Sequence, residues 1–232
     1  MFINSILKNK WIFRSLFKTI IFNFHYLPFK QAIKLPIFTY KLKIVKWRGG
    51  IEIPSSVHLK PGMIKLGVNR VSIYPNTGLI WENHGGKVIF QGSCNIGGNS
   101  AISVGEKGML VFGNNFSATT SLKLVCYNQI TFGNSVEFGW DCICMDTDFH
   151  RMKLIEGGFT KGFGFISIGD GNWFANRCTV LKNTVTAEYC TFSTSSVVSG
   201  KYEESYSVYG SSAISLKRKG IYRDRMDDTI NI

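Results

Sequence analysis

Residues 168–198 read IGDGNWFANRCTVLKNTVTAEYCTFSTSSVV, and every sixth position of this stretch falls in one register. The members of the register are mostly apolar: Ile168, Phe174, Val180, Thr186, Phe192 and Val198. Two positions before the last five lies a second register of mostly small residues: Asn172, Cys178, Thr184, Cys190 and Ser196. A period of six differs from the period of about 3.6 of a helix and of about 2 of a strand. It predicts a parallel β-helix in which each repeat forms one flat side of a coil.

The same period extends toward the N-terminus in shifted blocks. It begins near Phe90 and returns at Phe112 and Phe132, which indicates loops or uneven coils between the blocks. The region from Ile51 to Val88 is strand-like but irregular, as expected of the first coils of a solenoid. We therefore expect an all-β domain over residues 51–210, after an extension over residues 1–50 that is helical and irregular, and before a tail over residues 211–232.

One segment, residues 146–166, does not follow the repeat. Keeping the register would place His150, Glu156 and Gly162 inside the coil, where polar groups without partners are costly. We therefore expect this segment to leave the coil as a loop. A long loop on a regular scaffold usually carries function.

The positive charge is concentrated near the N-terminus. The formal net charge is +12, yet ten of the 27 Lys and Arg residues lie between Lys8 and Arg48, and the first acidic residue is Glu52. The remaining 17 basic and 15 acidic residues nearly cancel, so we expect no nucleic-acid partner for the body. On a helical projection of residues 2–24 one side is apolar, with the cations mostly opposite: Phe2, Ile6, Phe13, Leu16, Phe17, Ile20 and Phe24. Residues 1–48 therefore either associate with an anionic membrane surface or pack on the protein body or a neighbouring subunit.

The cysteines and the first residues of the chain indicate in which cellular compartment the protein works. The six cysteines include no Cys-x-x-Cys pair and no histidine at metal-ligand spacing, so we expect small buried side chains and no metal. No targeting peptide with a cleavage site is visible, and cations interrupt the apolar start too often for a spanning helix. We expect a cytoplasmic protein, with the inner face of the membrane as the peripheral alternative.

Three stretches resemble the hexapeptide-repeat acyltransferases, and more closely those that act on sugars in bacterial surface-polysaccharide synthesis. They are DTDFH at residues 146–150, IGDGNW at residues 168–173 with VLK at residues 180–182, and SVV at residues 196–198 with VYGSSA at residues 208–213. NFHYLP at residues 23–28 is also similar to some members. The resemblance implies a left-handed β-helix, a homotrimer with sites between subunits, and acetyl transfer from acetyl-CoA to a sugar or glycan.

In such enzymes the loop histidine is the general base, and His150 matches it. Imidazole titrates near neutral pH, so it can take the proton of an attacking hydroxyl and pass it to the departing thiolate. In an extended segment Asp148 points to the same side as His150, with Asp146 behind them, so either carboxylate is a candidate to orient the ring. The alternative for His150 is an ordinary solvated loop histidine.

Candidate donor-binding residues lie on the following coils and in the tail. Trp173 precedes an inward anchor and should point outward, either to stack on acetyl-CoA or to contact another subunit. Lys182 projects outward, where it can meet a phosphate, and Lys217 and Arg218 belong to a cationic cluster suited to the phosphates of coenzyme A or to a solvated surface. The chain departs from the family at Ala175, Ala187 and Ser193, where glycine is usual.

Two other functions remain open on sequence grounds. A β-helix carbonic anhydrase needs three histidines around zinc, and besides His150 the chain has only His25, His58 and His84, without paired spacing. A non-catalytic scaffold with an eroded donor site would explain the missing glycines. The leading expectation is an acetyltransferase that moves an acetyl group to a hydroxyl or, less favourably, an amine of a sugar or glycan.

Overall fold

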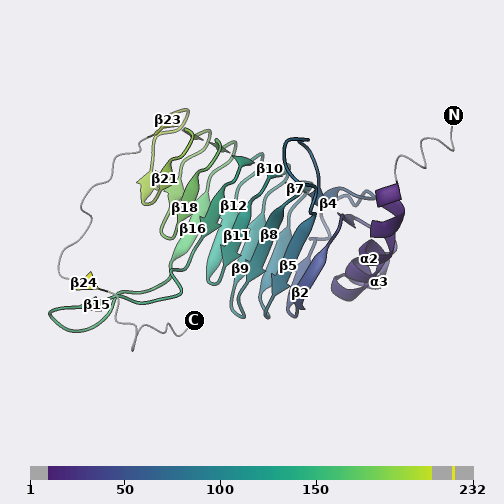
Figure 1. Ribbon diagram of the computed structural model, residues 1–232, viewed down its shortest axis with the longest axis horizontal. Helices are drawn as coiled ribbons and strands as arrows, with labels where there is room; N and C mark the ends of the chain where they lie inside the picture. Colours follow the sequence, from purple (N-terminus) through teal and green to yellow (C-terminus); the bar gives the residue numbers. More distant parts are fainter. Residues whose placement is uncertain (1–9, 211–220, 223–232) are drawn as a thin grey trace.

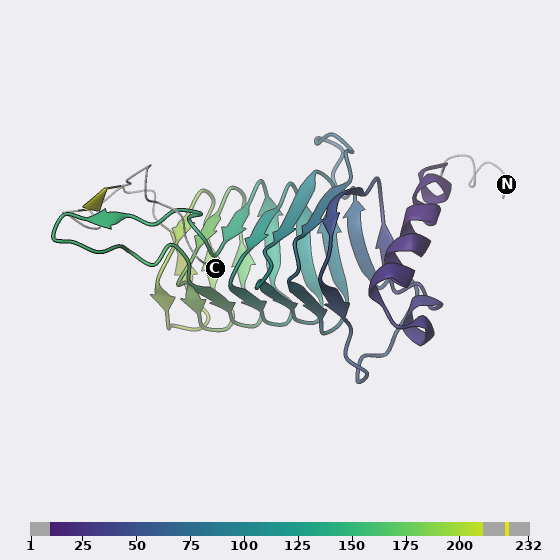
Figure 2. The same ribbon diagram turned by 90° about the horizontal axis from the view of Figure 1, so that it is seen from below.

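The computed structural model, which describes residues 10–210 and 221–222, is a solenoid of parallel strands (Figures 1 and 2). Successive strands visit three sheets in turn, so each coil has three sides. Sheet A contains β1 (Ile37–Thr39), β4 (Ile64–Val68), β7 (Cys94–Gly97), β10 (Phe116–Thr120), β13 (Glu137–Trp140), β17 (Trp173–Phe174), β20 (Thr191–Phe192) and β23 (Val208–Tyr209). Sheet B contains β2 (Lys43–Trp47), β5 (Leu79–Asn83), β8 (Ser100–Val104), β11 (Lys123–Cys126), β14 (Ile143–Met145), β18 (Thr179–Leu181) and β21 (Val197–Val198). Sheet C contains β3 (Gly50–Glu52), β6 (Lys87–Phe90), β9 (Met109–Phe112), β12 (Gln129–Phe132), β16 (Phe165–Ile168), β19 (Val185–Thr186) and β22 (Lys201–Tyr202).

The predicted registers form the interior of this solenoid. All six members of the main register are buried, and so are the five members of the small-residue register. Stacked phenylalanines run along the core on neighbouring coils: the rings of Phe138 and Phe174 lie 4.5 Å apart, and those of Phe174 and Phe192 lie 4.7 Å apart. The prediction of a parallel β-helix is therefore confirmed, and all six cysteines are buried as free thiols.

Close stacking of the coils explains why glycine stands at position 169, directly after the buried Ile168. A Cβ atom added to Gly169 would lie 2.5 Å from the carbonyl oxygen of Ala187 on the next coil, which is too close for any real side chain. Elsewhere the corners contain residues with positive φ other than glycine, such as Asn183 and Ser195. Asparagine and serine turn the chain at these corners with small polar side chains.

The solenoid begins earlier in the chain than the sequence predicts. We expected the coils to start at residue 51, but β1 pairs with β4 and β2 pairs with β5, so the first coil already includes Ile37. The spacing here hides the period of six: Ile37 pairs with Ile64, 27 residues later, whereas in the regular coils Trp173 pairs with Thr191, 18 residues later. Before β1 lie two helices, α2 (Lys10–Tyr26) and α3 (Phe29–Ala32). Figure 2 shows α2 lying across the N-terminal end of the solenoid.

Candidate functional site

The expected loop is an arm that leaves the solenoid between sheets B and C. It starts after Met145, the last residue of β14, and returns at Phe165, the first residue of β16. Backbone hydrogen bonds hold its two sides together at the base: the Asp148 amide donates to the Gly162 carbonyl at 2.8 Å, and the Gly164 amide donates to the Asp146 carbonyl at 2.9 Å. Figures 1 and 2 show the arm, which contains β15 (Lys153–Leu154), projecting away from the coils.

The buried carboxylate of Asp146 fixes the base of this arm. Its Oδ1 accepts the backbone N–H of Tyr127 and its Oδ2 accepts that of Asn128, each at 2.8 Å. Burial raises the pKa of Asp146 above its ordinary value, although these two N–H donors favour the ionised form. Both carboxylate oxygens are thus bonded to the neighbouring coil and the residue is fully buried, so Asp146 holds the base of the arm in place.

Asp148 and Lys182 form an ion pair at the same corner. β14 and β18 are neighbours in sheet B, with Met145 opposite Leu181, so the residues that follow them emerge side by side. The Lys182 Nζ lies 2.5 Å from Asp148 Oδ2. The sequence predicted these two residues for different tasks, and the structure brings them together. Lys182 therefore neutralises the carboxylate nearest to His150 in sequence.

His150 lies half-buried in the arm, two residues beyond Asp148. The expectation that both side chains point the same way required an extended segment, and this condition is not met. Phe149, between them, has a φ of 58°, in the left-handed region. Its amide donates to Thr147 Oγ1 at 3.0 Å, and its ring packs edge-on against Tyr127. The chain therefore turns between Asp148 and His150.

The two candidate donor residues that the structure describes, Trp173 and Lys182, do not share one surface of the chain. Trp173 points outward from sheet A and is 50% exposed, as predicted. Lys182 directly follows β18 of sheet B and pairs with Asp148 at the base of the arm. The arm and Trp173 therefore lie on different sides of the triangular coil. Lys217 and Arg218 lie outside the described residues.

A return of the chain to the arm was not expected from the sequence. Beyond the last coil, β24 (Ile221–Tyr222) pairs antiparallel with β15 (Lys153–Leu154) in the arm. Both strands have only two residues, so no periodicity could have indicated this pairing. The arm thus receives a segment from the C-terminal region.

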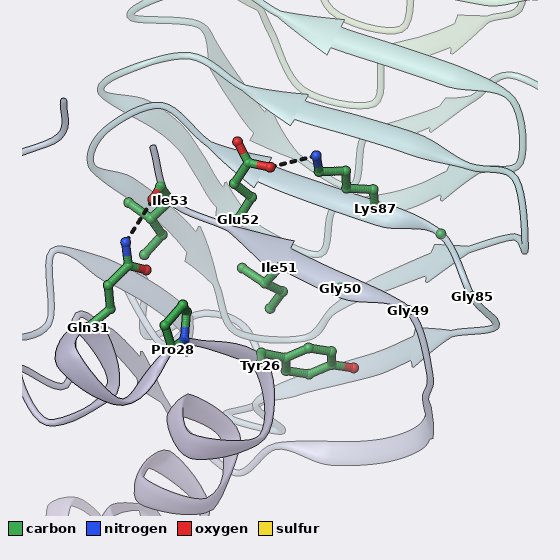
Figure 3. Close-up of a pocket in the computed structure, with 11 residues that line it drawn as sticks. Tyr26, Pro28, Gln31, Gly49, Gly50, Ile51, Glu52, Ile53, Gly85 and Lys87 are labelled. Atoms are coloured by element: carbon green, nitrogen blue, oxygen red, sulfur yellow. Dashed lines mark hydrogen bonds and ion pairs between the residues drawn. The ribbon is translucent and has the colours of Figure 1, made fainter. Parts of the chain in front are cut away.

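A pocket of about 510 Å³ lies at the N-terminal end of the solenoid, away from the arm (Figure 3). Tyr26 and Gln31 line it from the two helices, Pro28 from the link between them, and Ile51 from edge strand β3. The ion pair of Glu52 with Lys87, at 2.5 Å, lies at its border. No residue of the arm lines this pocket.

The other histidines that the structure describes have separate surroundings. His25 stacks on Trp47 and its Nε2 lies 2.8 Å from the Trp47 carbonyl oxygen, while His84 pairs with Glu82 at 3.1 Å. Within residues 10–210 and 221–222, no three His, Cys, Asp or Glu side chains are placed to hold a metal ion. Nothing in this part of the chain therefore favours the carbonic anhydrase alternative.

Comparison of the chain with models of protein families, with curated proteins and with solved structures found no match. Among the described helices, none is both long enough and apolar enough to cross a membrane.

Proposed function

We propose that the protein is an acetyltransferase that moves an acetyl group from acetyl-CoA to a hydroxyl, or alternatively an amine, of a sugar or glycan in bacterial surface-polysaccharide synthesis. The observation that carries the proposal is the arm at residues 146–164, which interrupts an otherwise regular solenoid and carries both His150 and, at its base, the Asp148–Lys182 ion pair. The sequence resemblance to hexapeptide-repeat acyltransferases supports the same reading. The proposal includes a left-handed winding of the coils, a cytoplasmic location and no metal requirement.

In the proposed reaction His150 is the general base. Its imidazole removes the proton of the acceptor hydroxyl while the oxygen attacks the thioester carbonyl carbon of acetyl-CoA. The carbon–sulfur bond then breaks, and the imidazolium returns the proton to the departing thiolate, which leaves as coenzyme A. The Lys182 ammonium beside Asp148 lowers the negative charge near the arm, which favours approach of the anionic donor.

The proposed assembly is a homotrimer. Trp173 lies on sheet A, whereas His150 lies on the arm between sheets B and C, so one chain does not bring them to one place. A site that uses both residues therefore needs the arm of one subunit to reach sheet A of another. In this arrangement Trp173 stacks on the donor, with Lys182, Lys217 and Arg218 proposed to bind its phosphates.

The test is release of coenzyme A from acetyl-CoA in the presence of sugar nucleotides and glycans. Replacing His150 by Ala should lower kcat by about 10²- to 10⁴-fold. His58→Ala is the matched control, because His58 is an exposed histidine outside the arm. An unchanged rate for His150→Ala would refute the assignment of the base.

The alternative function is a non-catalytic scaffold with an eroded donor site. Ala175, Ala187 and Ser193 occupy positions where related enzymes usually have glycine, which alters how closely a donor can approach the backbone. Isothermal titration calorimetry with coenzyme A separates the two functions. Binding supports the enzyme, whereas its absence together with no turnover of any acceptor favours the scaffold.

A further inference from the structure

Helix α2 turns a polar stripe toward the protein. Its buried side chains at Ser15, Thr19 and Asn23 follow one another at intervals of four residues, on the helix face that meets β1. The Asn23 Oδ1 accepts the Ile37 amide at 3.1 Å, and the Thr19 Oγ1 accepts the Thr39 amide at 3.0 Å. Because β1 is the edge strand of sheet A, these side chains satisfy backbone groups that would otherwise have no neighbouring strand. This contact, together with the buried Phe22 and Tyr26, attaches the helix to the solenoid.

The opposite face of the helices is apolar and exposed. Phe17 and Phe29 are each 70% exposed, and they belong to a set of large apolar side chains that face solvent on α2, α3 and the residue after α3. We call this set the outer apolar face: Leu16, Phe17, Ile20, Ile21, Phe24, Phe29 and Ile33. A helix that only packs on its own protein places its apolar stripe inward. α2 buries Phe22 and Tyr26 inward and still leaves large apolar side chains exposed on its outer side, which indicates that the outer face meets another apolar medium.

The segment that carries this face is strongly positive. Lys30 and Lys34 are exposed on or beside α3, and Lys43, Lys46 and Arg48 are exposed on the adjoining first coil, whereas the ammonium groups of Lys18 and Lys41 are bonded to the backbone carbonyls of Leu42 and Asn76. The sequence has no Asp or Glu before Glu52. A second copy of this chain would bring the same positive surface against it, so charge disfavours a symmetric contact and favours an anionic partner.

We propose that the outer apolar face docks on an anionic lipid surface. The aromatic and aliphatic side chains enter the boundary between headgroups and acyl chains, and the surrounding cations bind the lipid phosphates. Because α2 lies across the end of the solenoid (Figure 2), this contact would put that end on the lipid surface, with the axis of the solenoid pointing away from it. The proposal does not depend on the acetyl-transfer reaction, because it concerns only the helices and the first coil.

The experiment measures co-sedimentation of the full chain with two kinds of vesicle. One contains equal parts of phosphatidylcholine and phosphatidylglycerol, and the other contains phosphatidylcholine alone. The chain should sediment with the anionic vesicles, and added salt should weaken the binding. The double variant Phe17→Ser/Phe24→Ser should lower the bound fraction about tenfold or more, because it removes two insertions into the lipid. Lys30→Gln/Lys34→Gln should weaken binding to the anionic vesicles in particular.

The matched control is Val197→Ser/Val208→Ser, which removes two exposed apolar side chains from the far end of the solenoid. It should bind vesicles like the parent chain. The variant Phe24→Trp tests whether this position enters the lipid. The tryptophan fluorescence should shift to the blue when anionic vesicles are added, and brominated lipids should quench it. The lipid proposal is wrong if Phe17→Ser/Phe24→Ser binds vesicles as well as the parent chain does. It is also wrong if the parent chain binds no vesicles and the double variant has a lower oligomeric mass than the parent. That second result would identify the outer apolar face as a contact between subunits.

Discussion

The side chain of Asn23 pairs with the backbone of Ile37 as a neighbouring strand would. Its Oδ1 accepts the Ile37 amide at 3.1 Å, and its Nδ2 donates to the Ile37 carbonyl at 2.6 Å. In a β-ladder, a neighbouring strand makes hydrogen bonds to the same two backbone groups, the N–H and the C=O of one residue. The open edge of sheet A at β1 is thus closed by one asparagine on a helix, with help from Thr19, and Ser15 accepts the Lys41 amide just beyond β1.

Replacing Asn23 by Leu should destabilise the protein. The change leaves the buried N–H and C=O of Ile37 without their side-chain partner, and we expect a loss of about 2–5 kcal/mol in the free energy of unfolding. Denaturant unfolding followed by circular dichroism measures it. The exposed neighbour Phe24 provides the control, since Phe24→Ser should change stability by no more than about 0.5 kcal/mol. Equal effects at the two positions would contradict the edge-closing role.

Asp146→Asn should loosen the base of the arm. An amide group offers only one oxygen to the two N–H donors of Tyr127 and Asn128 and turns its own NH₂ toward the other. We expect a loss of about 1–3 kcal/mol at neutral pH, together with faster hydrogen exchange in the arm. Asp148→Asn is the comparison, because its exposed ion pair with Lys182 contributes little. A stable Asp146→Asn variant with unchanged exchange would show that these two bonds do not hold the arm.

Tyr26 gives the protein a specific dependence on alkaline pH. Burial raises the pKa of Tyr26 from 10.0 to about 12, while the Trp81 indole N–H donates to its hydroxyl. Since the folded pKa is the higher one, its contribution to stability is complete below about pH 10 and is lost as the pH rises toward about 12. Across this window the parent should lose about 2–3 kcal/mol more than Tyr26→Phe does. Urea unfolding of both proteins at a series of pH values checks this, and parallel pH profiles would refute it.

The coupling between Asp148 and Lys182 should be small. Both side chains are partly exposed, so a double-mutant cycle with Asp148→Asn and Lys182→Met should give about 0.2–1 kcal/mol at low salt. Added salt should reduce the coupling further. If the cycle gives several kcal/mol, the pair is shielded from water and its role in the fold is larger than the structure indicates.

The interior of the solenoid was predictable because a six-residue period is a local property of the chain. Phe174 and Phe192 are separated by three repeats in sequence and stack in space as the repeat requires. The arm was also predictable, since His150 in the register would have been buried in a narrow core. The partners of Asp146 were not, because Tyr127 and Asn128 lie on the preceding coil and no sequence period connects them to the arm.

The orientation of α2 could not be read from its amphipathic pattern. The projection placed Phe17, Ile20 and Phe24 on one side correctly, and the structure leaves that side exposed. Which side meets the protein is decided by hydrogen bonds to β1, a strand that the sequence did not predict as the first of the solenoid. Of the two interpretations left open for this segment, α2 packs on the body through the buried Phe22 and Asn23, and contact with a membrane surface stays a proposal.

The stacking of parallel coils also fixes how far the arm lies from the helix-covered end of the solenoid. Neighbouring coils lie about 4.8 Å apart, and four such steps lead from β1 through β4, β7 and β10 to β13, after which the arm departs. The arm therefore emerges about 20 Å along the axis from the helix-covered end. If that end sits on a bilayer and the proposed acetyl transfer takes place at the arm, an acceptor anchored in the lipid would need a spacer of comparable length before the sugar that receives the acyl group.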